Sequence, residues 1–81
     1  MEIKVLGTGC PKCKMLEKNA RDAVADLGIE ADIAKVADIN DIMEYNVMMT
    51  PALVINGKVK AAGRLPNVKE IKMMIQDEQE A

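Results

Sequence analysis

The chain has 81 residues, enough for one domain, because compact domains run from about 50 to 250 residues. Hydrophobic residues make up 49% and charged residues 30%, so the chain can form a hydrophobic core and is not disordered by composition. His, Trp and Phe are absent, which excludes imidazole catalysis, histidine metal sites and aromatic platforms for nucleic-acid bases. The net charge of −2 offers no attractive field to a polyanion, so we expect no nucleic-acid partner.

The amino terminus, Met1–Leu6, lacks the basic start and the long apolar run of a signal peptide, and its pattern is that of a first strand. No segment approaches the roughly 18 consecutive apolar residues that a membrane helix needs. We therefore expect a soluble, cytoplasmic, monomeric protein without a membrane partner and without a cofactor. Residues 1–76 are expected to form the single domain, and residues 77–81 a polar C-terminal tail.

Cys10 and Cys13 are the only cysteines of the chain. A bridge between them closes a very small ring, whereas a structural disulfide contributes most when it closes a long loop. A secreted miniprotein would also carry several such pairs. The spacing therefore favours a dithiol that opens and closes, or a clamp for a soft metal ion.

The first half of the chain has the pattern of a strand followed by a long helix. Ile3–Leu6 is short and apolar, and the glycines at positions 7 and 9 are expected to serve the geometry of the turn that follows. Pro11 suits the first position of a helix, because its fixed φ is helical and no N–H is needed there. Apolar or small residues then recur at steps of three and four through Leu27, and Gly28 is the expected left-handed terminator.

The second half alternates further strands with two shorter helices. The remaining strands are expected at Glu30–Val36, Ala52–Ile55 and Lys58–Ala62. Asp38 can cap a short helix over Ile39–Asn46. Asn56-Gly57 is a strong two-residue signal for a hairpin between the last two strands.

A capping pattern at Asn67 and Glu70 precedes the apolar stripe of a last helix, which runs from Val68 to Ile75. The predicted order is therefore β-α-β-α-β-β-α, which is an α/β fold. The opening βαβ unit should be parallel and the closing hairpin antiparallel. We therefore expect a four-stranded mixed sheet with helices on both faces.

In this order of elements the chain resembles the thioredoxin fold, and more narrowly the small thioredoxin-like redox-active disulfide proteins of glutaredoxin size. The resemblance covers about residues 2–76 and rests on Cys10-Pro11-Lys12-Cys13 after the first strand and on Thr50-Pro51 before the third. It implies a thiol–disulfide oxidoreductase that exchanges disulfides with a protein partner through a mixed disulfide and is served by an upstream reductase. It also implies that the peptide bond before Pro51 is cis and that the backbone of Thr50 binds the extended partner.

The residues themselves support this chemistry. With Pro11 at the first helical position, Cys10 becomes the N-cap, where unpaired N–H groups and the helix dipole favour an anion. Cysteines so placed commonly have pKa values of about 3.5–7.5 instead of about 8.5, and Lys12 and Lys14 add positive charge. We therefore expect Cys10 to be the nucleophile and Cys13 the resolving thiol.

The substrate-binding residues are expected to be Thr50, Pro51, Pro11 and Lys12, and no metal site is expected. Two positions depart from thioredoxins proper. Gly9 stands where those proteins carry a Trp, and Lys4 holds the only nearby position in the first strand for their buried acidic residue.

The chain has seven methionines. Four of them fall at or beside helical core positions and are expected to pack in the core, where Met fills gaps in the absence of Phe: Met15, Met43, Met73 and Met74. Met48 and Met49 adjoin Thr50 instead, and one of them could form an apolar rim for partner docking.

Two other functions use the same residues. The first is a soft-metal carrier of the ferredoxin-like type, in which both thiolates bind Cu(I); that fold ends in a strand, whereas this chain ends in an expected helix. The second is a non-catalytic adaptor, for which Cys10→Ser would leave partner binding intact.

Overall fold

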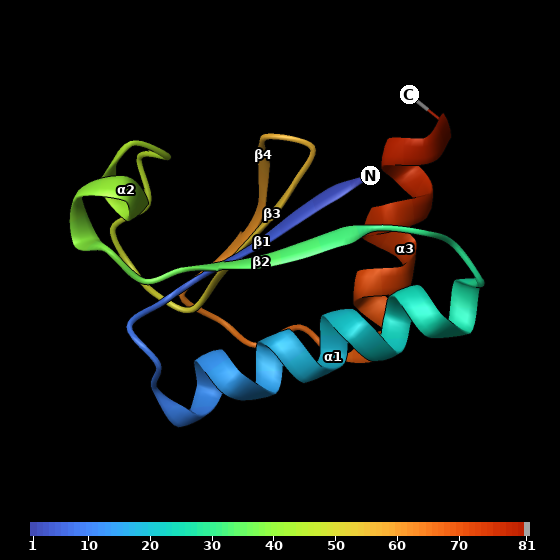
Figure 1. The fold of residues 1–81 in the computed structure, drawn as a ribbon, viewed down its shortest axis with the longest axis horizontal. Helices are drawn as coiled ribbons and strands as arrows, with labels where there is room; N and C mark the ends of the chain where they lie inside the picture. Colours follow the sequence, from blue (N-terminus) through green and yellow to red (C-terminus); the bar gives the residue numbers. More distant parts are fainter. Residues whose placement is uncertain (81) are drawn as a thin grey trace.

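Figure 1 shows the fold in a computed structural model, which describes residues 1–80. The elements are, in chain order, β1 (Glu2–Leu6), α1 (Pro11–Leu27), β2 (Asp32–Val36), α2 (Ile39–Met43), β3 (Ala52–Ile55), β4 (Lys58–Ala62) and α3 (Val68–Glu80). This β-α-β-α-β-β-α order is the one that the sequence predicts.

The strands form one four-stranded sheet in the order β2-β1-β3-β4. β1 runs parallel to β2 and antiparallel to β3, and β3 and β4 form the antiparallel hairpin. At the hairpin turn, Asn56 and Gly57 have φ angles of 50° and 80°, and two positive values are what a type I′ turn requires. The predicted mixed sheet is confirmed.

The helices cover the two faces of the sheet unequally. α1 and α3 lie on one face, and α2 lies at one end of the other face (Figure 1). Because side chains alternate along a strand, β1 directs Ile3 and Val5 toward α1 and α3, and Leu6 toward α2. Burying one such side chain contributes about 1.5–3 kcal/mol, so these two clusters supply most of the stability.

The two shorter helices differ in length from the expectation. α2 ends at Met43 instead of Asn46, because Asn46 takes a left-handed φ of 59° and the N–H of Tyr45 bonds the nearer carbonyl of Ile42. α3 extends through Glu80, so residues 77–80, which were expected to form a polar tail, are helical. Residue 81, the end of that expected tail, lies outside the described residues.

An ion pair with the sheet accounts for the extra turn of α3. Glu78 pairs with Lys60 and, at 3.4 Å, with Lys58, both on β4. The hydrogen bond from Lys60 holds the pKa of Glu78 below its usual value. The apolar stripe of the sequence stops before this residue, so the pattern alone could not place it in the helix.

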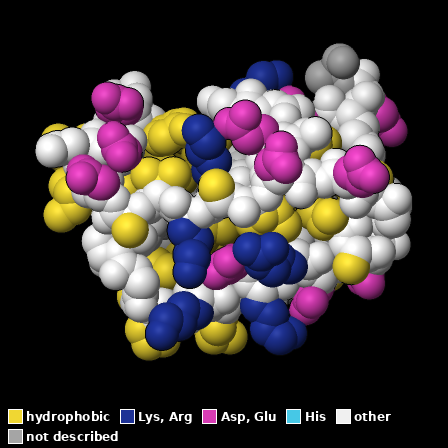
Figure 2. All heavy atoms as spheres, viewed as in Figure 1, with side chains coloured by type: hydrophobic (Ala, Val, Ile, Leu, Met, Phe, Trp, Pro, Cys, Tyr) yellow, Lys and Arg dark blue, Asp and Glu magenta, His cyan; other side chains and the backbone are white. Residues whose placement is uncertain are grey.

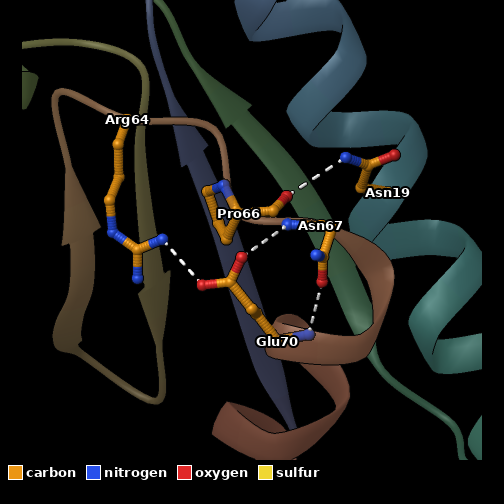
Figure 3. A network of polar contacts seen from close by, with 5 residues as sticks. All are labelled: Asn19, Arg64, Pro66, Asn67 and Glu70. Carbon is orange, nitrogen blue, oxygen red and sulfur yellow. Dashed lines mark hydrogen bonds and ion pairs between the residues drawn. The ribbon is translucent and has the colours of Figure 1, made fainter.

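The start of α3 carries the predicted reciprocal cap and joins it to α1 (Figure 3). The N–H of Glu70 donates to the Asn67 side chain at 2.8 Å, and the Glu70 carboxylate accepts from the Asn67 N–H at 3.3 Å. Arg64 donates to the same carboxylate at 2.8 Å. The Asn19 side chain of α1 donates to the carbonyl of Pro66 at 3.1 Å, which joins α1 to the loop that leads into α3.

The acid stability of the fold should depend on Glu70. The hydrogen bond from Arg64, followed by that from the Asn67 N–H, lowers the pKa of this carboxyl in the folded protein. The stabilisation is therefore present above the unfolded pKa and is lost as the pH falls through the folded pKa. We expect Glu70→Gln to be less stable than the wild type at neutral pH and to lose less stability on acidification.

Urea unfolding between about pH 7 and pH 3 measures this difference. Arg64→Gln and the double variant complete a thermodynamic cycle. If the free energies of unfolding of the wild type and of Glu70→Gln changed in parallel with pH, the contact between Arg64 and Glu70 would have no energetic role.

Candidate active site

The two cysteines lie at the junction between β1 and α1. Cys10 has extended backbone angles (φ −66°, ψ 162°) and is the N-cap of α1, with Pro11 at the first helical position. Its sulfur accepts the backbone N–H of Cys13 at 3.2 Å, as an N-cap side chain does. The two residues form a disulfide, and their Cα atoms are 5.1 Å apart, within the usual range of about 4.4–6.8 Å.

The helix exposes the two sulfurs to different extents. Cys13 faces the core side of α1 and is only 5% exposed, whereas Cys10 is half-buried. Pro11 and Lys12 between them are exposed, and the first turn of α1 contains no acidic residue. The site therefore has one accessible sulfur in a locally positive environment and one protected sulfur behind it.

Gly7 has a role that the sequence analysis did not predict. Gly7 is buried, and its N–H donates to the carbonyl of Val36 at 2.9 Å. Its φ angle is not positive, so turn geometry does not require glycine here. A Cβ added at this position would overlap the sulfur of Cys13. Glycine is therefore needed for close packing, while at Gly9, with φ 91° and open space around it, glycine serves turn geometry as expected.

The peptide bond between Thr50 and Pro51 is cis, as expected from the resemblance. The register of β1 and β3 pairs Leu6 with Ala52, so the next residues along the two strands, Gly7 and Pro51, come side by side. Pro51 is buried, and its carbonyl accepts the N–H of Gly63 at 2.9 Å. The sheet thus brings the exposed Thr50 and the cis proline to the same end as the disulfide.

Lys4 lies on the other face of the sheet. Its side chain donates to the hydroxyl of Tyr45 at 3.1 Å and pairs with Glu2 at 3.2 Å, and the Tyr45 contact is the larger reason why its pKa is raised. Along β1 it alternates with Val5, which faces α1, so Lys4 does not face the cysteines. No polar or charged residue is buried as a whole among residues 1–80. Glu78, whose side chain is only 7% exposed, pairs with Lys58 and Lys60 on β4, so no buried acid accompanies Cys13.

Three methionines expected in the core are exposed instead: Met15, Met43 and Met73. Of that group only Met74 packs against the core. The expectation was wrong because each of the three lies beside, and not on, the buried stripe of its helix. Met48 and Met49, which directly precede Thr50, are exposed as well, and Met49 packs on Gly63.

A groove of about 410 Å³ opens beside the disulfide loop, and we call it the α2 groove. It is lined by Thr8, Ile39, Ile42, Met43, Val47, Met48 and Thr50. Two of these residues, Thr8 and Thr50, belong to the two loops that meet at the disulfide. From the sequence, only the expectation that Met48 or Met49 forms an apolar rim pointed to this surface, and of the two Met48 lines it.

The comparisons with known proteins agree with this geometry. A family model described as a thioredoxin domain matches residues 1–76. The chain belongs to the thioredoxin family. It is 43% identical over 75 residues to a thioredoxin of Methanothermobacter thermautotrophicus, covering 93% of this chain and 97% of that protein. It is 44% identical over 70 residues to a thioredoxin of Methanocaldococcus jannaschii, covering 86% and 80% respectively.

Family membership and the paired cysteines together identify the protein as a thiol–disulfide oxidoreductase. The metal-carrier alternative is not supported, because the chain belongs to the thioredoxin family and its last described element is the helix α3, whereas the ferredoxin-like fold has a strand there. None of the helices within residues 1–80 is long and apolar enough to cross a membrane.

Gly7 and Gly9 flank Thr8 and offer a matched pair of substitutions. Gly7→Ala places a methyl group against the Cys13 sulfur, so we expect it to displace Cys13 and to lower the fraction of disulfide at a given ratio of dithiothreitol to its oxidised form. Gly9→Ala meets no atom and should cost only about 1–2 kcal/mol for its positive φ.

Thiol quantification after acid quenching measures the disulfide fraction, and urea unfolding measures the stability. Equal disulfide fractions in the two variants would contradict the packing role of Gly7.

Proposed function

We propose that Cys10 is the attacking thiolate and Cys13 the resolving thiol in disulfide exchange with a protein substrate. Support comes from the half-buried position of Cys10 at the start of α1, where its sulfur accepts a backbone N–H at 3.2 Å. The helix dipole and the exposed Lys12 and Lys14 add positive potential, and no acidic residue in the first turn offsets it. Each of these contributions stabilises the thiolate over the thiol.

The exchange has two steps. The Cys10 thiolate attacks one sulfur of the substrate disulfide, forms a mixed disulfide and releases the other substrate sulfur as a thiolate. Cys13 then attacks the Cys10 sulfur, which closes the Cys10–Cys13 disulfide and releases the second substrate thiol. The substrate gains two electrons and two protons, and the dithiol of the protein loses them.

The proton of Cys13 needs an acceptor in the second step. No acidic residue is buried as a whole among residues 1–80, and the buried carboxylate of Glu78 pairs with lysines of β4, so the acceptor that the reaction itself supplies is the substrate thiolate released in the first step. Cys13 is then deprotonated only after the substrate is attached. This order keeps the buried sulfur unreactive toward other disulfides.

The substrate binds in an extended conformation across the loops that meet at the disulfide. Thr50 is exposed beside the cis Pro51, and its backbone is positioned to pair with an added strand. Pro11 and Lys12, also exposed, form the opposite side of the binding site. The protein acts in the cytoplasm as a monomer, and an upstream reductase returns two electrons to the disulfide.

Trapping with cysteine variants tests the two roles. Cys13→Ser should accumulate a mixed disulfide with a disulfide-bonded protein such as insulin, because the first step proceeds and the second does not. Cys10→Ser is the matched control and should accumulate none, because the remaining thiol is buried. Non-reducing electrophoresis and mass spectrometry detect the adduct, and stable adducts on Cys13 alone would reverse the assignment.

The pH dependence of alkylation tests the thiolate. In the Cys13→Ser variant we expect the rate of reaction of Cys10 with iodoacetamide to rise through an apparent pKa below the usual value of about 8.5. Because a lowered pKa means more thiolate at neutral pH, the rate should be close to its plateau by about pH 7.5.

Lys12→Gln combined with Lys14→Gln should move this apparent pKa upward, whereas Lys69→Gln on α3 should not. A profile identical to that of a free thiol would overturn the proposed activation of Cys10.

A further inference from the structure

We propose that the α2 groove selects protein substrates that carry an apolar side chain, followed by a basic residue, within a few residues of the target cysteine. The inference rests on the proposed function and specifies the class of protein that the site reduces.

The groove begins next to the reacting sulfur. Thr8 precedes Cys10 by two residues and Thr50 precedes the cis Pro51 by one, and both residues line it. Consecutive Cα atoms are 3.8 Å apart, so the Thr8 edge lies within about 8 Å of Cys10 along the chain. A substrate segment attached to Cys10 and extended by about 3.3 Å per residue therefore enters the groove two or three residues from its cysteine.

The lining of the groove is apolar and uncovered. Ile42 and Val47 are buried and form its floor, whereas Ile39 and Met43 are 61% and 63% exposed and Met48 is 97% exposed. Methionine side chains are unbranched and adapt to partners of different shape. The volume of about 410 Å³ is within the range of about 300–1,000 Å³ seen for binding pockets. The groove therefore suits an apolar side chain of variable shape.

The helix that borders the groove, α2, carries acidic residues. Asp38, Asp41 and Glu44 are exposed on this helix or at its ends, and none of them takes part in an ion pair among the described residues. Figure 2 shows acidic side chains gathered over the end of the molecule where α2 lies in Figure 1, beside hydrophobic ones.

On the disulfide side, by contrast, Lys12 and Lys14 are exposed. A substrate segment that runs from Cys10 across the groove thus leaves a basic environment and arrives in an acidic one. Charge complementarity favours a cation at its far end and disfavours an anion there.

Peptide disulfides test this selection in the wild-type protein. The probe has the pattern Lys-x-Leu-x-Cys-x-Leu-x-Lys, where x is Ser, with its cysteine joined to mercaptoethanol. The peptide sequence is symmetric about its cysteine, so it presents the same residues to the groove whichever direction its chain runs. We expect reduction to slow about tenfold when both Leu are replaced by Ser. Replacing both Lys by Glu should slow it about threefold, because exposed charge pairs contribute little, and this second effect should shrink at 1 M salt.

Variants of the protein test whether the preference for Leu and Lys in the peptide comes from the α2 groove. Met43→Gln with Met48→Gln should reduce the preference for Leu, whereas Met73→Gln, on the exposed side of α3, should keep it. Asp41→Lys with Glu44→Lys should favour the Glu peptide over the Lys peptide, whereas Asp77→Lys on α3 should not. All of these positions are exposed, and the wild-type comparison stands even if a variant fails to fold.

Reduction of hydroxyethyl disulfide, a small neutral disulfide, separates this inference from the proposed function. If that reaction proceeds and the three peptides react at equal rates, the groove does not select substrates, although Cys10 still acts as proposed. If neither the small disulfide nor any peptide reacts, the proposed function and this inference are both wrong.

Discussion

The close approach of Gly7 to Cys13 is the contact on which the site depends. It brings the end of β1 against the buried sulfur, where the space left is too small for any side chain. Because Leu6 pairs with Ala52 in the neighbouring strand, the same register brings Pro51 to this end of the sheet. The helix start, the disulfide and the cis proline therefore lie together through one backbone arrangement, and a methyl group added at position 7 would overlap the side chain of Cys13.

The different roles that we propose for the two cysteines follow from helix geometry. A residue at the N-cap lies at the positive end of the helix dipole, and a residue three positions later lies on the same face, one turn further into the protein. The core is formed independently of the disulfide, by fully buried side chains such as Leu16, Leu53 and Ile71. A bridge across three positions adds little chain-entropy stabilisation, so the disulfide can open without loss of the fold.

Local signals in the sequence were sufficient to predict most of the fold. Certain residues determine the backbone conformation within a few positions: Pro11, Gly28 and the pair Asn56-Gly57. The helix and the hairpin whose ends these residues mark are both observed. The failures concern long-range contacts. The packing of Gly7 on Cys13 depends on how β1 meets α1, and the last turn of α3 depends on the ion pair with β4. The exposure of the methionines depends on which side of each helix faces the sheet. A stripe of mixed apolar residues in the sequence does not determine that side.

The unequal covering of the sheet connects the architecture to substrate binding. α1 and α3 bury one face, but the only helix on the other face within residues 1–80 is the five-residue α2. It packs there together with Tyr45 and Val47 and leaves the groove beside it open. In a chain without Phe or Trp, Met43 and Met48 supply the apolar surface there. A longer α2 with a complete core would close the groove and leave substrates only the thiol chemistry to recognise. The incomplete face thus provides the surface that we propose selects protein substrates beside Cys10.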